Sequence, residues 1–259
     1  MNVVENRWPP LEVIARSDTG RVRATNEDAV LVMEGVPWLA LSDGMGGYRG
    51  GEVASRVALA AVASLAPAEV APEMGLTGAL ELMKRAIQEA NAAIFREVGR
   101  QPALAGMGAT IVSALFWSGR LVVGHVGDSR MYRLRGGELL RLTRDHSLIQ
   151  EQLDRGLIAP DEVAFSPDRG RLTRALGVDP QVQPDMASYP AFPGDVYLLC
   201  SDGLTDMVTD RDLATVLALA EGRLQATADE LVALANARGG KDNISLIMAQ
   251  VPPDRVGRA

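Results

Sequence analysis

Two aspartates in this sequence follow apolar runs and precede glycine, a pattern that suits metal-dependent chemistry. Asp43 follows the run Leu39–Ser42 and Asp202 follows the run Tyr197–Ser201, so the motif Ser-Asp-Gly occurs twice. Each apolar run predicts a buried strand, and the glycine permits a sharp turn or the close approach of a ligand. One Asp-Gly pair is commonly a hairpin turn. Two in one chain favour a carboxylate cluster, which requires cations because like charges repel each other and raise pKa values.

Other acidic residues stand beside glycines or at expected strand ends. They are Glu27, Asp28, Asp128, Asp206 and Asp242. The chain has 2 histidines and 1 cysteine, and neither histidine has a partner at the spacing of a ligand pair, so zinc is disfavoured. His125 lies in an apolar run, where a packing role is expected. An all-oxygen site favours Mg²⁺ or Mn²⁺ over Ca²⁺, because the calcium-loop pattern is absent.

The composition predicts a globular protein with an acidic balance. Of its 259 residues, 47% are hydrophobic and 4% are aromatic, so the core must consist mainly of aliphatic side chains. The 33 acidic residues outnumber the 26 basic ones, and no Lys/Arg-rich run occurs, so nucleic acid is not expected as a partner. No apolar window reaches the ~18 residues of a membrane span, and Met1–Pro10 lacks the features of a signal peptide. We expect a cytoplasmic monomer without membrane association.

Apolar periodicity predicts which elements position the acidic residues. Strands are expected at 11–16, 29–33, 38–42, 110–117, 121–126, 130–135, 138–142, 196–200 and 244–251, and helices at 54–65, 77–99, 148–153, 212–220 and 226–237. Pro67 should end the first helix, and Thr77 and Gly99 should cap the second. Short turns between strands favour antiparallel sheets covered by helices, an α+β architecture. The irregular segment 143–177 should lie on the surface as a lid.

Six short motifs in order resemble those of bacterial type-2C metal-dependent serine/threonine protein phosphatases of the PPM family. They are Asn26-Glu27-Asp28, Asp43-Gly44-Met45-Gly46-Gly47, Gly127-Asp128-Ser129-Arg130, Thr143-Arg144-Asp145-His146-Ser147, Ser201-Asp202-Gly203-Leu204-Thr205-Asp206 and Asp242-Asn243-Ile244. Each motif alone is weak, but the ordered set is specific and extends from about Arg16 to Val251. The resemblance implies a four-layer αββα sandwich of two antiparallel sheets flanked by helix pairs. A single phosphatase domain would span 1–251, with a flap at about 146–176 and a disordered tail at 252–259.

The resemblance also implies roles for individual residues. Asp43 would bridge two Mg²⁺ or Mn²⁺ ions, and Glu27 and the Gly44 carbonyl would complete one ion's shell. Asp202 and Asp242 would hold the other ion.

A third, weaker ion would bind Asp128 and Asp206 together with Asp202, and Arg23 would bind the substrate phosphate. Taken alone, Asp128 is equally consistent with a plain turn residue, Asp206 with a helix-start acid and Arg23 with an exposed arginine. Met45 stands where eukaryotic relatives carry a histidine, a proposed general acid. The leaving-group proton would then come from a metal-bound water or from the substrate.

The chemistry of such a site suits hydrolysis of a phosphate monoester. Two ions ~3.5–4 Å apart can activate a water and neutralise the phosphoryl oxygens together. Because the sequence has no Cys-x5-Arg motif, we expect direct attack by this water without a phosphoenzyme, with Arg23, Asp43 and Asp202 as catalytic residues. The expected substrates are phosphoserine and phosphothreonine proteins of a cognate Ser/Thr kinase. Two alternatives are a phosphatase-like binding module without turnover and a phosphoesterase for small metabolites.

Overall fold

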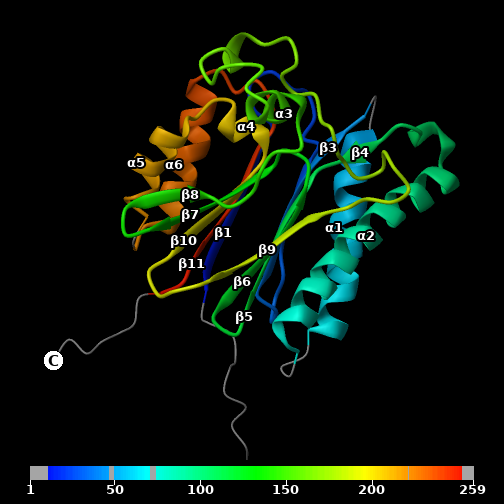
Figure 1. The fold of residues 1–259 in the computed structure, drawn as a ribbon, viewed down its shortest axis with the longest axis horizontal. Helices are drawn as coiled ribbons and strands as arrows, with labels where there is room; N and C mark the ends of the chain where they lie inside the picture. Colours follow the sequence, from blue (N-terminus) through cyan, green and yellow to red (C-terminus); the bar gives the residue numbers. More distant parts are fainter. Residues whose placement is uncertain (1–10, 47–49, 71–73, 221, 253–259) are drawn as a thin grey trace, which may run out of the picture.

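Two antiparallel β-sheets lie face to face in the computed structural model, which describes residues 11–46, 50–70, 74–220 and 222–252 (Figure 1). The first sheet has the strand order β1 (Glu12–Asp18), β11 (Ile244–Gln250), β10 (Val196–Cys200), β7 (Arg130–Arg135) and β8 (Glu138–Arg141). The second has the order β2 (Asp28–Val32), β3 (Trp38–Met45), β5 (Ile111–Trp117), β6 (Arg120–Val126) and β9 (Asp185–Pro190), and β4 (Gly108–Ala109) pairs with the end of β3.

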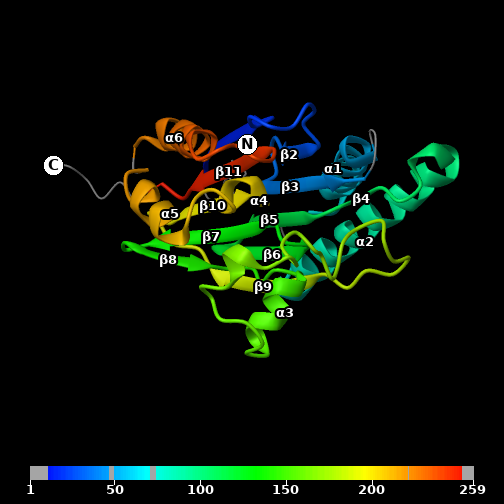
Figure 2. The ribbon, with the colours of Figure 1, turned by 90° about the horizontal axis from the view of Figure 1, so that it is seen from above.

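A pair of helices covers the outer face of each sheet (Figure 1). The second sheet is covered by α1 (Gly50–Glu69) and α2 (Leu76–Arg100), and the first by α5 (Asp210–Leu217) and α6 (Leu224–Ala237). The short helices are α3 (Leu148–Asp154), α4 (Asp202–Thr205) and the 3-10 turns Pro102–Leu104 and Val163–Phe165. Figure 2 shows α3 and the segment after it projecting from the sandwich beyond β9. The predicted four-layer αββα sandwich is confirmed.

Three apolar layers hold the sandwich together. Ile87 belongs to the cluster between α1, α2 and the second sheet, and Leu231 to the cluster between α5, α6 and the first sheet. Between the sheets, Phe116 and Tyr197 meet edge to face with their ring centroids 5.2 Å apart. The apolar stripes expected on the helices therefore face the sheets. None of the helices in the described part of the chain has the length and apolar character needed to cross a membrane.

The structure corrects several expected boundaries. β3 continues to Met45, beyond the expected end at Ser42, because its last residues pair with β4. α1 continues past Pro67 to Glu69, because proline removes one hydrogen-bond donor without preventing the residues after it from adopting helical dihedrals. Gly47, Met1–Pro10 and the tail beyond residue 252 lie outside the described residues, so the expectations made for them stay predictions.

Three other elements differ from expectation. α2 begins one residue before Thr77, with Gly75 at its N-cap and no capping side-chain bond, and Gly99 lies inside it. α5 begins at Asp210, where Thr209 caps it by accepting from the amide of Asp212. The edge strand β9 was not predicted, because its polar residues and terminal proline lack a strand pattern and only pairing with β6 defines it.

Candidate metal centre

Five acidic residues come together at one end of the sandwich because five different chain segments end there. Glu27 precedes β2, and Asp43 lies in β3 opposite Asp28 in the β2–β3 register. Asp128 is in the turn between β6 and β7, Asp202 begins α4 directly after β10, and Asp242 precedes β11. The strands are held in the core by their apolar residues, so these side chains reach the same edge of the two sheets.

A cavity of about 300 Å³ joins these acidic side chains. It is lined by Arg23, Glu27, Asp43, Gly44, Met45, Gly46, Thr110, Asp128, Gly170, Leu172, Asp202, Asp242 and Asn243. The lining includes every predicted site residue except Asp206. Asp206 lines an adjoining cavity of about 370 Å³, which shares Asp128, Gly170 and Asp202 with the first.

Burial raises the pKa of most acidic side chains at this end of the sandwich and so disfavours their charged forms. Loss of hydration, followed by the charges of neighbouring carboxylates, raises the pKa of Asp43 well above its usual range. Loss of hydration also raises the pKa of Asp28 to about 7, of Asp128 to about 8 and of Asp202 to about 6. Desolvation likewise raises the pKa of Glu27. A cation in the cavity would offset this repulsion and favour the ionised carboxylates.

The donor set of the cavity fits a hard divalent cation. Oδ1 of Asp202, which lines the cavity, is buried and finds no hydrogen-bond partner among the described residues. The same holds for Oδ1 of Asp28, which does not line the cavity but lies opposite Asp43 in the β2–β3 register. A buried polar atom without a partner is costly unless something binds it. The atoms available as metal ligands are carboxylate and carbonyl oxygens, which Mg²⁺ and Mn²⁺ prefer. Asp28 received no role from the sequence, although it belongs to the Asn26-Glu27-Asp28 motif that could have indicated one.

Asn243 is a functional candidate that the sequence reasoning missed. Its Nδ2 donates to the carbonyls of Thr19 and Thr25, both at 2.9 Å, and its Oδ1 accepts from the Glu27 amide at 2.8 Å. The side chain of Asn243 therefore holds in place the loop that contains Arg23. Asn243 directly follows Asp242, so this loop is fixed next to Asp242. The Asp-Asn pair before a strand was the available signal, but its partners lie more than 200 positions away.

Close backbone approach explains two of the glycines beside the cluster. A Cβ added to Gly44 would lie 2.0 Å from the Gly51 carbonyl oxygen, and one added to Gly203 would lie 2.0 Å from the Asn243 carbonyl oxygen. Both distances exclude any larger residue. The glycine after each aspartate therefore lets a neighbouring chain pack against the cavity wall, and neither Ser-Asp-Gly motif is a hairpin turn.

Asp206 lies close to the cluster but is bound by Arg169, a residue of the segment expected to act as a flap. The chain turns helically after Asp202, and the Asp206 amide donates to the Asp202 carbonyl at 2.7 Å. After burial, the charge of Asp206 is the next cause of the raised pKa of Asp202, so the two carboxylates repel each other. Nη2 of Arg169 lies 2.8 Å from Oδ2 of Asp206. A flap cation therefore neutralises this carboxylate.

The two histidines are neighbours, although their sequence spacing did not indicate it. His125 is 4% exposed, as its expected packing role requires, and its ring stacks on that of His146. Neither lines the metal-centre cavity. Met45 does line it, and its thioether has no proton to donate. Ser147 caps α3 as expected, because its Oγ accepts from the Gln150 amide at 3.3 Å.

Comparison with known proteins agrees with this geometry. The sequence model of the family described as protein phosphatase 2C matches residues 20–238. The serine/threonine protein phosphatase PstP of Mycobacterium tuberculosis is 42% identical over 241 residues, which cover 93% of this chain and 45% of that protein. The serine/threonine phosphatase stp of Listeria monocytogenes is 36% identical over 249 residues, 94% of this chain and 97% of that protein. The chain thus spans about half the length of the mycobacterial relative.

Solved structures share the same fold. The crystal structure of M. tuberculosis PstP/Ppp has a TM-score of 0.85 at 41% identity, covering 93% of this chain and 99% of that one. The catalytic domain of PstP in complex with 2 manganese ions has a TM-score of 0.83 at 40% identity, with 93% and 98% covered. Stp1 from Staphylococcus aureus has a TM-score of 0.86 at 31% identity, with 97% and 99% covered. This chain therefore belongs to the protein phosphatase 2C family.

Proposed function

We propose that this protein is a Mg²⁺- or Mn²⁺-dependent serine/threonine protein phosphatase that hydrolyses its substrate by direct attack of water, without a phosphoenzyme. The observation that carries the proposal is the cluster of carboxylates with raised pKa values around one cavity, with Arg23 at its wall. The relatives named serine/threonine phosphatases and the PstP domain that holds 2 manganese ions support the same function.

The carboxylates would divide between two core ions. Asp43 would bridge them, because it lies in the middle of the cluster and the charges of Asp28, Asp202, Asp128 and Asp242 all raise its pKa. Glu27 and the Gly44 carbonyl would complete the shell of one ion. Asp202 and Asp242 would hold the other.

A third, weaker ion would bind Asp128, Asp202 and Asp206, which line the adjoining cavity. When bound, the core ions would lower the pKa of a water and neutralise phosphoryl oxygens. Arg23 would orient the phosphate through its guanidinium, which suits bidentate contacts with phosphate oxygens. Asn243 would keep Arg23 and Glu27 at a fixed distance from Asp242.

The substrates would be phosphoserine and phosphothreonine proteins, including those of a cognate Ser/Thr kinase. The two cavities adjoin and are open to solvent, so a phosphorylated side chain could enter while its polypeptide stays outside. A phosphatase-like binding module would not require this costly set of desolvated carboxylates. A small-metabolite phosphoesterase remains an alternative that the substrate comparison below decides.

The phosphatase domain would span residues 1–251, with the segment at about 146–176 acting as the flap. The pairing of Ser147 with Leu172 at the base of this segment supports that division. We also propose a cytoplasmic monomer.

The test is turnover of p-nitrophenyl phosphate and of a phosphothreonine peptide after chelation and after addition of Mn²⁺ or Mg²⁺. Activity should disappear with EDTA and return with either ion. If the protein hydrolyses p-nitrophenyl phosphate but dephosphorylates no member of a phosphoprotein panel, the metabolite alternative would be favoured. Undiminished turnover after thorough chelation would contradict the metal centre.

A further inference from the structure

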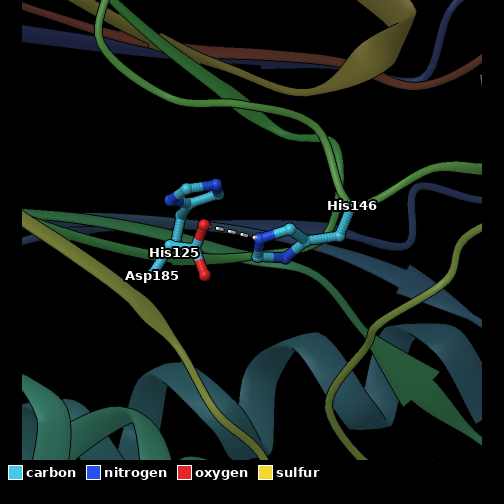
Figure 3. A group of neighbouring side chains, drawn as sticks. All are labelled: His125, His146 and Asp185. Carbon is cyan, nitrogen blue, oxygen red and sulfur yellow. Dashed lines mark ion pairs between the residues drawn. The ribbon is translucent and has the colours of Figure 1, made fainter. Parts of the chain in front are cut away.

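A histidine pair and an aspartate form a polar cluster (Figure 3), and one of its histidines, His146, contacts Gly127 in the turn that carries Asp128. The rings of His125 on β6 and His146 at the start of the flap stack with centroids 4.6 Å apart and planes inclined by 15°. Asp185 on β9 is the cross-strand partner of His125. Its Oδ2 lies 3.3 Å from Nε2 of His146, the contact drawn in Figure 3.

Hydrogen bonding defines which ring nitrogens carry protons. Burial lowers the pKa of both rings, that of His146 to about 4, so each is neutral at pH 7 and carries one N–H. Nε2 of His125 lies 2.8 Å from the Arg144 carbonyl and donates to it. Nδ1 of His146 accepts from the Gly127 amide at 3.1 Å. The proton of His146 is therefore on Nε2, which lies near Oδ2 of Asp185 but makes no hydrogen bond among the described residues.

This tautomer disfavours a metal ion between the three side chains. Their potential ligand atoms lie within 4.8 Å of one another. However, Nε2 of His146 would have to lose its proton while Nδ1 still accepts from Gly127, which would leave an anionic imidazolate. The Asp185 carboxylate is already neutralised, because Nη1 of Arg174 donates to its Oδ1 at 2.6 Å. The cluster is better explained as a support for neighbouring backbone.

That backbone is Gly127, which His146 contacts from two directions. The ring accepts from the Gly127 amide, and the His146 amide donates to the Gly127 carbonyl at 2.9 Å. Gly127 has φ +106°, and an added Cβ would lie 2.6 Å from side-chain atoms of Thr110. Only glycine can therefore adopt this conformation here, and His146 stabilises it through two hydrogen bonds. Asp128 is the next residue, so the direction of its carboxylate depends on this turn.

His146 also joins this turn to the base of the flap. Its carbonyl accepts from the Thr173 amide at 2.9 Å, where the two ends of the flap come together. Arg174, the next residue, binds Asp185 and donates to the Gln183 carbonyl at 2.7 Å. One side chain and its backbone therefore contact the Asp128 turn, the flap base and, through Asp185, the edge strand β9.

We propose that His146 is a positioning residue that holds the Gly127–Asp128 turn so that Asp128 can bind the third, weakest divalent ion. This inference rests on the role of Asp128 in the proposed function. It assigns no contact with substrate to His146. The essential feature of the His146 side chain is Nδ1, which accepts the hydrogen bond from the Gly127 amide.

The test compares three substitutions of His146, which distinguish the effect of losing the hydrogen-bond acceptor from the effect of changing the side-chain volume. His146→Asn can place an amide oxygen near the position of Nδ1, His146→Gln extends its amide toward Asp185, and His146→Leu has no acceptor. Trp38→Phe is the matched control, because it removes a different buried bond, Nε1 to Ser113 Oγ at 2.7 Å, at the far end of β3.

The first readout is calorimetric titration with MnCl₂ alone. His146→Leu and His146→Gln should weaken the weakest Mn²⁺ site by about 10-fold or more, the size typical of residues that orient metal ligands. His146→Asn should restore most of that loss, and the core ions should bind normally in every variant. The second readout is hydrogen–deuterium exchange of segment 125–130 in the metal-free protein, which should be faster in His146→Leu than in His146→Asn.

The outcomes separate this inference from the function on which it rests. Equal Mn²⁺ affinity and equal exchange in His146→Asn and His146→Leu, with the third ion lost in Asp128→Ala, would overturn the positioning role alone. If Asp128→Ala binds Mn²⁺ as the wild type does, the third site and this inference would both be overturned. If His146→Leu does not fold, the difference between His146→Asn and His146→Gln decides.

Discussion

Nη2 of Arg23 donates a hydrogen bond to Oδ2 of Asp242 at 2.6 Å. The residue proposed to bind phosphate is therefore oriented by a residue proposed to bind metal. The hydrogen bond and charge of Asp242 raise the pKa of Arg23, so the guanidinium stays charged. A phosphate that binds Arg23 would approach the cation site at the same time.

Arg23→Ala should raise KM for a phosphopeptide more than it lowers kcat, because a contact equally strong in the ground and transition states contributes to binding alone. Steady-state kinetics at saturating Mn²⁺ provide the measurement. Arg21→Ala is the control, because Arg21 precedes the same loop and lines neither cavity. A fall in kcat with unchanged KM would instead assign Arg23 to the transition state.

Asp43→Asn should lower turnover by about 10²-fold or more, because several kcal/mol of metal-derived stabilisation would be lost and each 1.36 kcal/mol is tenfold. The Tm of the metal-free variant should be at or above that of the wild type, because one repelling carboxylate has been removed. Thermal unfolding in EDTA and turnover with Mn²⁺ test both parts. Turnover close to the wild-type rate would show that Asp43 does not bridge the ions.

Asp212→Asn is the matched control for that substitution. It also replaces an aspartate with asparagine, but at an ion pair with Arg238, and Asp212 lines neither cavity. It should leave turnover unchanged, since exposed pairs contribute about 0–1 kcal/mol to stability.

Arg169→Ala should tighten the weakest Mn²⁺ site by about 2- to 5-fold, because Asp206 would no longer be neutralised by the flap and an exposed ion pair is worth roughly 0.2–1 kcal/mol. Calorimetry with MnCl₂ measures this change. Arg171→Ala is the matched control, because it removes another flap pair, with Asp168 at 2.9 Å, that does not include Asp206. Weaker Mn²⁺ binding in Arg169→Ala would show that the pair organises Asp206 and does not compete with the ion.

The Tm of the metal-free protein should fall as the pH rises from 6.5 to 8.5. The pKa of Asp28 is raised to about 7 and that of Asp128 to about 8, above the ordinary value of 3.8. Their stabilising contribution is therefore complete below about pH 4 and is lost as the pH rises through the folded pKa values. Histidines of the unfolded chain have an ordinary pKa of about 6.5, so their opposing contribution is nearly complete within the first pH unit of this range.

Thermal unfolding in EDTA at several pH values measures this slope. Asp128→Asn should flatten it, because one of the titrating groups is removed, and saturating Mn²⁺ should oppose it by binding the ionised carboxylates. A Tm that stays constant or rises over this range in EDTA would contradict the raised pKa values.

Local patterns in the sequence predicted much of the fold and most of the candidate site. The run Val196–Cys200 is a strand with the expected bounds, because a short continuous apolar run indicates a fully buried strand. The Ser-Asp-Gly motifs identified Asp43 and Asp202 because two such motifs after apolar runs in one chain favour a carboxylate cluster. The order of strands and helices, with the ordered motifs, was enough to predict the layered sandwich.

Only the tertiary structure decided which distant residues meet. The burial of Asp28 opposite Asp43, the pairing of Asp206 with Arg169 and the stacking of His125 on His146 depend on segments that the fold brings together. The spacing of residues along the sequence does not predict these contacts, because they arise from strand register and from the packing of the flap base. The sequence by itself therefore determined the chemistry of the donors, and the packing of the two sheets decided their positions and the groups that support them.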